Sequence, residues 1–219
     1  TAIAMLILLV GTFVFYPILS IFTGAFQDFD GSFTSEGARR NIGDPKIWSL
    51  GCLAGGSCGV AWRTLFLALC TATATTLLGL AFALVATRTS FPFKKSLRLL
   101  TVLPIFSPPF VVGLVLIMLL GRQGTLTELI EATIVLDLGR WLYGLTGIWL
   151  AQVLSFTPIS FLVLIGVVEG VSPSMEEASQ TLRAGRWRTF RKVSLPLMAP
   201  GLANAFLIGF IESMADFGN

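Results

Sequence analysis

The chain alternates between long apolar runs and shorter polar segments. Each apolar run reaches or approaches the roughly 20 residues that a helix needs to cross the hydrocarbon core of a membrane. The five runs cover about residues 2–22, 62–86, 99–120, 145–168 and 197–214. The pattern therefore predicts an all-α fold, a polytopic bundle of transmembrane helices.

The charges between the runs indicate how the helices are oriented. Lys and Arg concentrate in the cytoplasmic loops of membrane proteins. Segment 87–98 carries four basic residues and no acid, and segment 169–196 carries five basic residues against three acids. Segments 23–61 and 121–144 have fewer basic residues for their length. We therefore expect 87–98 and 169–196 in the cytoplasm, the N-terminus inside and Asn219 outside.

The composition excludes several functional classes. Hydrophobic residues make up 54% of the 219 residues and charged residues only 12%. A chain with so few charged residues has too little polar surface to cover a water-soluble globule. The net charge of +3 is small and sits in loops beside apolar runs, so we expect no nucleic-acid partner. The sequence has no His, no G-x-x-x-x-G-K-[ST] loop and no visible nucleophile–base or metal constellation. We expect no cofactor and no enzymatic activity, with any ATP hydrolysis on a separate polypeptide.

Segment 172–196 is a charged segment between two apolar runs, and its first part has the features of a helix start. Ser174 and Glu177 have the S-x-x-E spacing of a capping box. Pro173 and Glu176 suit a first helical turn. The pattern predicts a short helix that begins here.

Gly185 suits the left-handed position just past the end of that helix, because it lacks a Cβ. A second short helix is expected to follow and to end at Leu195-Pro196. Its apolar residues recur at helical spacing, as Trp187, Phe190 and Val193. Two short helices joined by a glycine and held between two spans favour a docking surface over a catalytic pocket.

The same segment resembles the cytoplasmic EAA loop of ATP-binding-cassette (ABC) transporter permeases. That pattern runs Glu-Ala-Ala, three residues, Gly, nine residues and Ile-x-Leu-Pro. Here it reads Glu177-Ala178-Ser179 and then, in register, Val193-Ser194-Leu195-Pro196. One departure is Arg183, which stands where the pattern has its Gly; the nearest glycine is Gly185.

In that family the loop inserts into a cleft on an ATPase subunit. The resemblance therefore implies the type I ABC importer permease fold, present here in part, with a cytoplasmic coupling-helix loop in a bacterial inner membrane. The implied partners are cytoplasmic ATPase subunits, a periplasmic or extracellular substrate-binding protein, and a second permease half or copy. The candidate coupling residues are Glu176, Glu177, Ala178, Ser179, Gly185, Arg186, Val193, Leu195 and Pro196. An ordinary amphipathic loop between two spans is the alternative.

The third apolar run is interrupted by Pro104 and by Pro108-Pro109. Proline removes a backbone donor, and membrane depth tolerates this only where protein or a water-lined cavity covers the freed carbonyl. Broken helices often mark transport paths, so Pro108 and Pro109 are candidates for a substrate path. A kinked packing helix is the alternative, and Pro158 in the fourth run raises the same two possibilities.

The last apolar run carries acids near its end. Glu212 lies about 16 residues beyond Pro196, or roughly 24 Å along a helix, and Asp216 follows one turn later. An intramembrane carboxylate is costly and by default suggests function. Glu212, Ser213 and Asp216 are therefore candidates for coordinating or steering a cation. Acids solvated at the outer headgroups are the alternative.

Residues 1–61 are expected to form the first helix and an exterior loop, and residues 62–219 the permease core. Cys52 and Cys58 bracket a short loop on the oxidising side of the membrane, where a disulfide is permitted. Two free thiols are the alternative. The chain lacks an initiating Met and stops just after an apolar run, so we interpret it as a fragment.

Three stretches resemble ferric-iron uptake permeases in particular: 103–110, 120–124 and 211–219. Sulfate, thiamine and polyamine permeases share much of this pattern and remain alternatives. A secondary transporter or channel would need charge pairs or proton-relay acids deep in several spans, and the first four runs contain no deep acid. A purely structural membrane subunit is disfavoured by the broken third run and the EAA resemblance.

Overall fold

The computed structural model describes residues 2–27, 34, 39, 42–51, 58–90, 92–128 and 141–216. Within these ranges the chain is mainly helical, and an isolated antiparallel bridge pairs Leu50 with Cys58. The predicted all-α fold is confirmed. Helices long and apolar enough to cross a membrane cover Ile3–Gly24, Val60–Arg88, Pro109–Glu128, Leu145–Gly170 and Arg186–Ala215.

The chain divides into two compact units, Thr1–Thr64 and Leu65–Asn219. The first unit begins with one apolar helix in three consecutive sections. These are α1 (Ala2–Val10), a π-helical turn (Gly11–Phe15) and α2 (Tyr16–Gly24). No residue in the apolar stretch of this helix is buried within the chain, so its surface is suited to lipid or to another membrane subunit.

The first unit continues with the short helix α4 (Pro45–Trp48). Asp44 caps this helix by accepting a hydrogen bond from the Lys46 N–H at 2.9 Å. The indole N–H of Trp62, in the first turn of α5 (Val60–Arg88), donates to the Trp48 carbonyl at 3.1 Å. These bonds join α4 to the start of the second span.

The described residues include two of the three cysteines, Cys58 and Cys70. Cys58 takes part in a disulfide, whereas Cys70, in the second span, is a free thiol. Cys52 lies outside the described residues, so the pairing of Cys52 with Cys58 stays a prediction.

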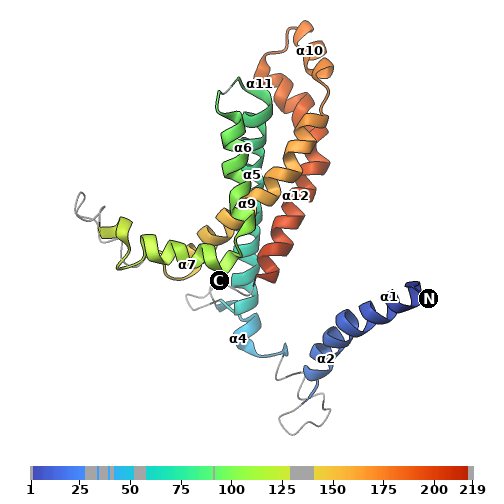
Figure 1. Ribbon diagram of the computed structural model, residues 1–219, viewed down its shortest axis with the longest axis vertical. Helices are drawn as coiled ribbons and strands as arrows, with labels where there is room; N and C mark the ends of the chain where they lie inside the picture. The colour runs from blue at the N-terminus through green and yellow to red at the C-terminus, as the bar shows by residue number, and fades with distance from the viewer. Residues whose placement is uncertain are drawn as a thin grey trace. The chain divides into compact units, whose positions relative to one another are not determined.

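The second unit is a bundle in which α5, α6, α9 and α12 run side by side, with α10 and α11 at one end (Figure 1). After α5, its helices up to the loop are α6 (Lys94–Val102), a 3-10 turn (Leu103–Phe106), α7 (Pro109–Leu120) and α9 (Leu145–Gly170). The loop and last span comprise α10 (Pro173–Thr181), α11 (Arg186–Thr189), a π-helical turn (Phe190–Ser194) and α12 (Leu195–Ala215).

Helix α9 lies at the centre of this bundle. Its side chains Phe161, Leu164 and Val168 are fully buried and form one core cluster with Ala83, Val171, Met198 and Ala205. Small residues let the helix backbones approach closely. A Cβ built at Gly79 of α5 would lie 2.9 Å from the backbone of α9, and one at Gly209 of α12 would lie 2.9 Å from the hydroxyl of Thr75. The core therefore depends on glycine at two helix crossings.

The third apolar run is two helices, not one. Helix α6 contains the basic residues Lys94, Lys95 and Arg98 and ends before the 3-10 turn, and α7 begins at Pro109. Ser107 and Pro108 are extended, with ψ of 128° and 144°, because a residue before proline is driven out of the helical region. The chain turns sharply there, and α7 points away from α6 (Figure 1). The predicted single span at 99–120 is thus wrong in its bounds, although the predicted break is confirmed.

The helix after the loop does not stop at Leu195-Pro196. Sections α11, the π-helical turn and α12 are continuous, and the Leu195 N–H donates to the Phe190 carbonyl. Proline cannot donate a backbone hydrogen bond and crowds the preceding turn, and a π-turn, whose bonds span five residues, provides a wider turn. The prediction that Leu195-Pro196 ends the second short helix is therefore wrong. Pro17 follows the π-turn of the first span in the same way.

Candidate functional site

The first loop helix, α10, starts two residues earlier than its capping box predicted. Ser172 is the N-cap, with ψ of 128°, and Pro173 occupies the first helical position as predicted. The Ser172 and Ser174 hydroxyls are hydrogen-bonded at 2.7 Å. Ser174 therefore lies inside the helix, and the Ser174–Glu177 capping box is wrong. The extended conformation that proline imposes on Ser172 sets the helix start.

The end of α10 places Arg183, and not Gly185, in the left-handed conformation. Arg183 has φ of 61°, whereas Gly185 has φ of −66° and serves as the N-cap of α11. The Ala184 N–H bonds the Ser179 carbonyl at 3.2 Å, and the Arg183 N–H bonds the Gln180 carbonyl at 2.9 Å. This pair of bonds is the Schellman motif, which needs a left-handed residue at the position Arg183 occupies. The predicted role of Gly185 at the helix end is wrong.

The loop is fastened to the bundle by Arg88, the last residue of α5. Its guanidinium donates to Glu176 Oε2 at 3.1 Å in an ion pair, and to the carbonyls of Val168 and Val171 at 3.2 and 2.9 Å. The other oxygen of Glu176, Oε1, accepts from the buried Ser194 hydroxyl at 2.7 Å. One carboxylate thus joins α10 to α5 and to the π-turn that leads into α12.

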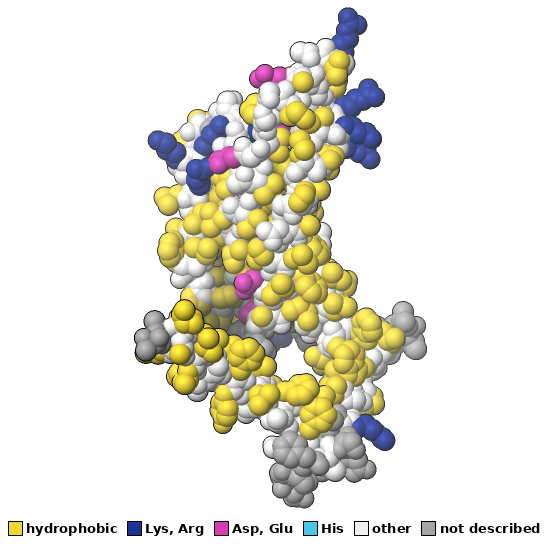
Figure 2. All heavy atoms as spheres, turned by 90° about the vertical axis from the view of Figure 1, so that its right-hand side faces the viewer, with side chains coloured by type: hydrophobic (Ala, Val, Ile, Leu, Met, Phe, Trp, Pro, Cys, Tyr) yellow, Lys and Arg dark blue, Asp and Glu magenta, His cyan; other side chains and the backbone are white. Residues whose placement is uncertain are grey.

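The outer face of the loop is exposed and carries both charge and apolar side chains. Glu177, Ala178 and Arg186 are exposed, and Ser179 and Val193 are half-buried. Leu182 is 84% exposed and Trp187 is 73% exposed, with the Trp187 ring stacked on Phe190 at 5.8 Å between ring centroids. Lys and Arg side chains gather at this end of the molecule, above a largely hydrophobic body (Figure 2). These properties suit a protein-docking face.

At the opposite end of the bundle, Gln152 of α9 is the centre of a buried polar cluster. Gln152 is 2% exposed, and its Oε1 accepts from the Thr71 hydroxyl of α5 at 3.0 Å and the Ser213 hydroxyl of α12 at 2.7 Å. Its Nε2 donates to Asp216 Oδ2 at 3.0 Å. Two of the predicted path residues, Ser213 and Asp216, are therefore brought together, whereas Glu212 is exposed.

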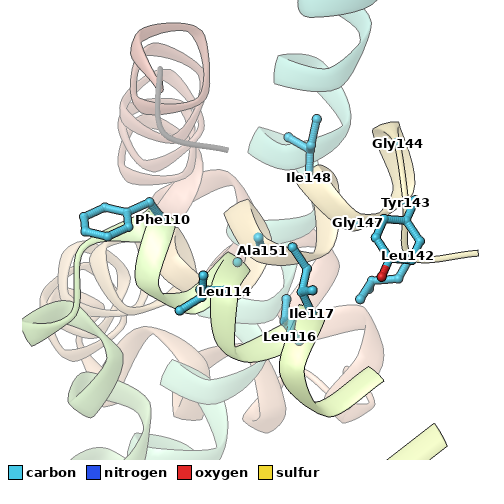
Figure 3. Close-up of a pocket in the computed structure, with 11 residues that line it drawn as sticks. Phe110, Leu114, Leu116, Ile117, Leu142, Tyr143, Gly144, Gly147, Ile148 and Ala151 are labelled. Atoms are coloured by element: carbon cyan, nitrogen blue, oxygen red, sulfur yellow. The ribbon is translucent and has the colours of Figure 1, made fainter. Parts of the chain in front are cut away.

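A separate pocket of about 320 Å³ lies between α7 and the segment that leads into α9 (Figure 3). Its walls include Phe110, Leu114, Ile117 and Ile148, with the Tyr143 hydroxyl as the polar side-chain group. None of the described residues that line it is a carboxylate, so these residues offer a cation no charged ligand. The predicted path residues Pro108 and Pro109 lie just before this pocket and shape it by starting α7, rather than by joining the Gln152 cluster.

Among the described residues, no group of three or more His, Cys, Asp and Glu side chains is placed to hold a metal ion.

Comparison with known proteins identifies the family. The model of the family "Binding-protein-dependent transport system inner membrane component" matches residues 75–218, which include the α10–α11 loop and the whole of α12. The chain belongs to this family. The predicted resemblance to the permeases of binding-protein-dependent importers is confirmed, and with it a multi-pass inner-membrane protein.

Two curated members of this family show how the similarity is distributed. The ferric transport system permease protein FbpB of Actinobacillus pleuropneumoniae is 41% identical over 218 residues, covering 100% of this chain and 30% of the relative. The molybdenum transport system permease protein ModB of Escherichia coli K12 is 35% identical over 146 residues, covering 64% of this chain and 60% of the relative. The chain spans about a third of the length of the ferric permeases that it matches.

A crystal structure of a bacterial ABC transporter involved in alginate import has the same fold. The match has a TM-score of 0.68 at 19% identity and covers 97% of this chain and 73% of that chain. The predicted importer permease fold is thereby confirmed.

Sequence reasoning missed three residues that organise these sites: Arg88, Gln152 and Ser194. In the sequence, Arg88 stands out only as one of the basic residues that orient the spans, and Gln152 is a single amide inside an apolar run. Its isolation in hydrocarbon was the available signal, because a buried amide needs partners. The partners themselves lie 61 to 81 residues away in the chain, so no local pattern marks them.

Proposed function

We propose that this chain is the membrane-spanning part of a bacterial ABC importer for ferric iron, and that it forms half of the substrate path. The observation that carries the proposal is the 41% identity to the ferric permease FbpB across the whole chain. Residues 103–110, 120–124 and 211–219, which resemble iron permeases, add to it. Sulfate, thiamine and polyamine are competing substrates because their permeases share much of this sequence pattern. Molybdate joins them because the molybdenum permease ModB is also similar.

ATP hydrolysis belongs to separate cytoplasmic ATPase subunits in this proposal. The α10–α11 loop faces the cytoplasm, which puts the N-terminus inside, as the basic residues of segments 87–98 and 169–196 favour. An external binding protein delivers the iron, and a second permease half or copy completes the path.

The outer face of the loop is the docking face for the ATPase. Glu177, Ala178 and Arg186 are exposed to a partner, and Leu182 and Trp187 supply apolar area that the chain itself does not cover. Closure of the ATPases on nucleotide moves the loop, and the spans exchange an inward-facing for an outward-facing arrangement. Gly185, Val193, Leu195 and Pro196 act by shaping the helix that joins the loop to α12.

The buried polar cluster around Gln152 is the proposed transient binding site for the cation at the outer end of the bundle. The carboxylate of Asp216 supplies negative charge. The Gln152 side-chain amide donates to this carboxylate, and the Ser213 hydroxyl in turn donates to the Gln152 side-chain oxygen. Glu212, one turn earlier and exposed, is a second carboxylate available to an arriving cation. An intramembrane carboxylate is costly, and its presence here supports a role in transport.

Uptake of labelled ferric iron tests the function directly. Cells that carry the full-length protein with its ATPase and binding protein should accumulate ferric iron, and cells that lack this protein should not. Sulfate, thiamine, polyamine and molybdate uptake should be the same in both. Iron uptake that persists without any ATPase would instead support a secondary transporter, and copurification of the ATPase gives an independent check.

A further inference from the structure

One guanidinium connects three helices where the bundle meets the loop. Arg88 is the last residue of α5, and its NH1 and NH2 groups reach α10 through Glu176 and the end of α9 through the carbonyls of Val168 and Val171. The last carbonyls of a helix have no partner within the helix and favour a cation. The planar fork of arginine holds its donors in a fixed geometry toward the carboxylate and these carbonyls, whereas the compact ammonium of lysine on its flexible stem does not.

The Arg88–Glu176 pair is better shielded from solvent than the chain's other described inter-helix ion pair. Its side chains are 28% and 24% exposed, whereas Arg98 and Glu169 are 54% and 55% exposed. Exposed ion pairs contribute little because water and salt screen them. Arg98–Glu169 also joins α6 to the end of α9 and does not touch the loop, so the two pairs differ in what they connect.

Helix α10 rests on the bundle through polar contacts and not through a packed apolar interface. None of its residues is buried. Beneath it lies a cavity of about 450 Å³ whose walls include Arg88, Glu176, Ser194 and Met198. Since little apolar surface holds α10 in place, the Glu176 carboxylate, between Arg88 and Ser194, is the main connection from the helix to the spans below it.

We infer that Arg88 is a positioning residue for energy coupling: it transmits movement of the α10 helix to α5 and α9. The backbone already joins the loop to α9 through Val171 and Ser172 and to α12 through the π-turn, but it gives α10 no direct route to α5, which Arg88 ties to both α10 and α9. The clasp formed by Arg88, Glu176 and Ser194 makes the end of α5, the end of α9 and the start of α12 follow the loop together. This inference rests on the proposed function, because it assumes that the loop is moved by an ATPase.

Charge substitutions in the complete transporter test the clasp. The variants are Arg88→Glu, Glu176→Arg and the double exchange, and the matched controls are Arg98→Glu, Glu169→Arg and their double exchange. Each is reconstituted with its ATPase and binding protein, and iron uptake and ATP hydrolysis are measured in the same vesicles. The deciding quantity is the number of ions taken up per ATP hydrolysed, because loss of protein alone lowers both rates and leaves their ratio unchanged.

Arg88→Glu and Glu176→Arg should each lower this ratio about fivefold or more, the size of a typical coupling between sites, while the ATPase still copurifies. The double exchange should recover part of the ratio, and the Arg98 and Glu169 controls should keep the wild-type value. If Arg88→Glu does not accumulate in the membrane, two milder variants replace it. Arg88→Lys keeps the charge but loses the fixed fork, Ser194→Ala removes the single bond from Ser194 to Glu176, and each should lower the ratio in the same direction.

A wild-type ratio in the Arg88 and Glu176 variants, or an equal fall in the controls, overturns the inference. That result differs from failure of the proposed function, in which the wild-type protein itself would show no ATP-dependent iron uptake.

Discussion

The side-chain amide of Gln152 donates a 3.0 Å hydrogen bond to the carboxylate of Asp216, which lies 64 residues further along the chain. The bond crosses from near the start of α9 to the residue that ends α12. Gln152 also accepts hydrogen bonds from the hydroxyls of Thr71 and Ser213, so one residue joins α5, α9 and α12 at this end of the bundle. A shift of α5 or α12 that moves Gln152 therefore also moves the amide that donates to the Asp216 carboxylate.

Replacing Gln152 with Leu should impair both stability and uptake. The Thr71 and Ser213 hydroxyls would lose their acceptor inside the bundle, at a cost of roughly 1–3 kcal/mol for a buried polar group left unpaired. Thermal unfolding of the detergent-solubilised protein measures this loss. Thr73→Val is the matched control, since Thr73 is exposed and bonds only the carbonyl of Leu69, and its melting temperature should stay close to wild type.

Gln152→Glu separates the two roles of the residue. The carboxylate keeps the acceptors for Thr71 and Ser213 but replaces the donor to Asp216 with a second negative charge. We expect the rate of iron uptake to fall clearly while the melting temperature stays closer to wild type than it does in Gln152→Leu. Uptake at the wild-type rate in this variant would contradict a role for the Gln152–Asp216 bond in transport.

The presence of the apolar spans and the place of the loop along the chain could be predicted from the sequence, because both depend on local composition, although the bounds of the third span could not. A run of about 20 apolar residues and a cluster of basic residues can each be recognised from residues that are adjacent in the sequence. Pro173 at the first position of α10 and the break before Pro109 were predictable for the same reason, since proline constrains its own residue and the one before it.

What the sequence could not indicate are the pairings between distant helices and one backbone conformation. Gln152 and Arg88 each have partners more than 60 residues away, so their roles depend on the packing of the bundle. Arg183 misled in a different way. A glycine two residues later suggested that Gly185 takes the left-handed turn, but the hydrogen bonds at the end of α10 require that turn at position 183 whatever its side chain.

Gly79 should not tolerate even a methyl group. A Cβ at this position of α5 would lie 2.9 Å from the backbone of Ser160 and Phe161 in α9, so Gly79→Ala forces the two helices apart. Overpacking of this kind costs typically about 1–3 kcal/mol. The control is Gly166→Ala in α9, where a Cβ meets nothing within 4 Å. Thermal unfolding should show a lower melting temperature for Gly79→Ala and an unchanged or higher one for Gly166→Ala.

Leu182 should contribute to ATPase binding and little to folding. Its side chain is 84% exposed, so Leu182→Asp removes no packing within the chain. If the ATPase covers this residue, burying the new carboxylate without a partner should weaken the complex by several kcal/mol. Leu182→Met keeps the apolar character and is the control. Copurification of the ATPase should be lost for Leu182→Asp and kept for Leu182→Met, at equal amounts of membrane protein, and equal copurification in both would place the ATPase elsewhere.

Arg183 should accept glycine, and Gly185 should accept alanine. At φ of 61° a residue with a Cβ is strained by roughly 1–2 kcal/mol, which Arg183→Gly relieves, although the greater freedom of glycine in the unfolded chain offsets part of the gain. Arg183→Val should lower the melting temperature, because a β-branched side chain is poorly tolerated at this φ.

Gly185 has φ of −66° and open space around its Cβ position. Gly185→Ala should therefore leave the melting temperature within about 2 °C of wild type, the range of a harmless surface change. The opposite order, with Gly185→Ala harmful and Arg183→Val harmless, would place the left-handed turn at Gly185 instead.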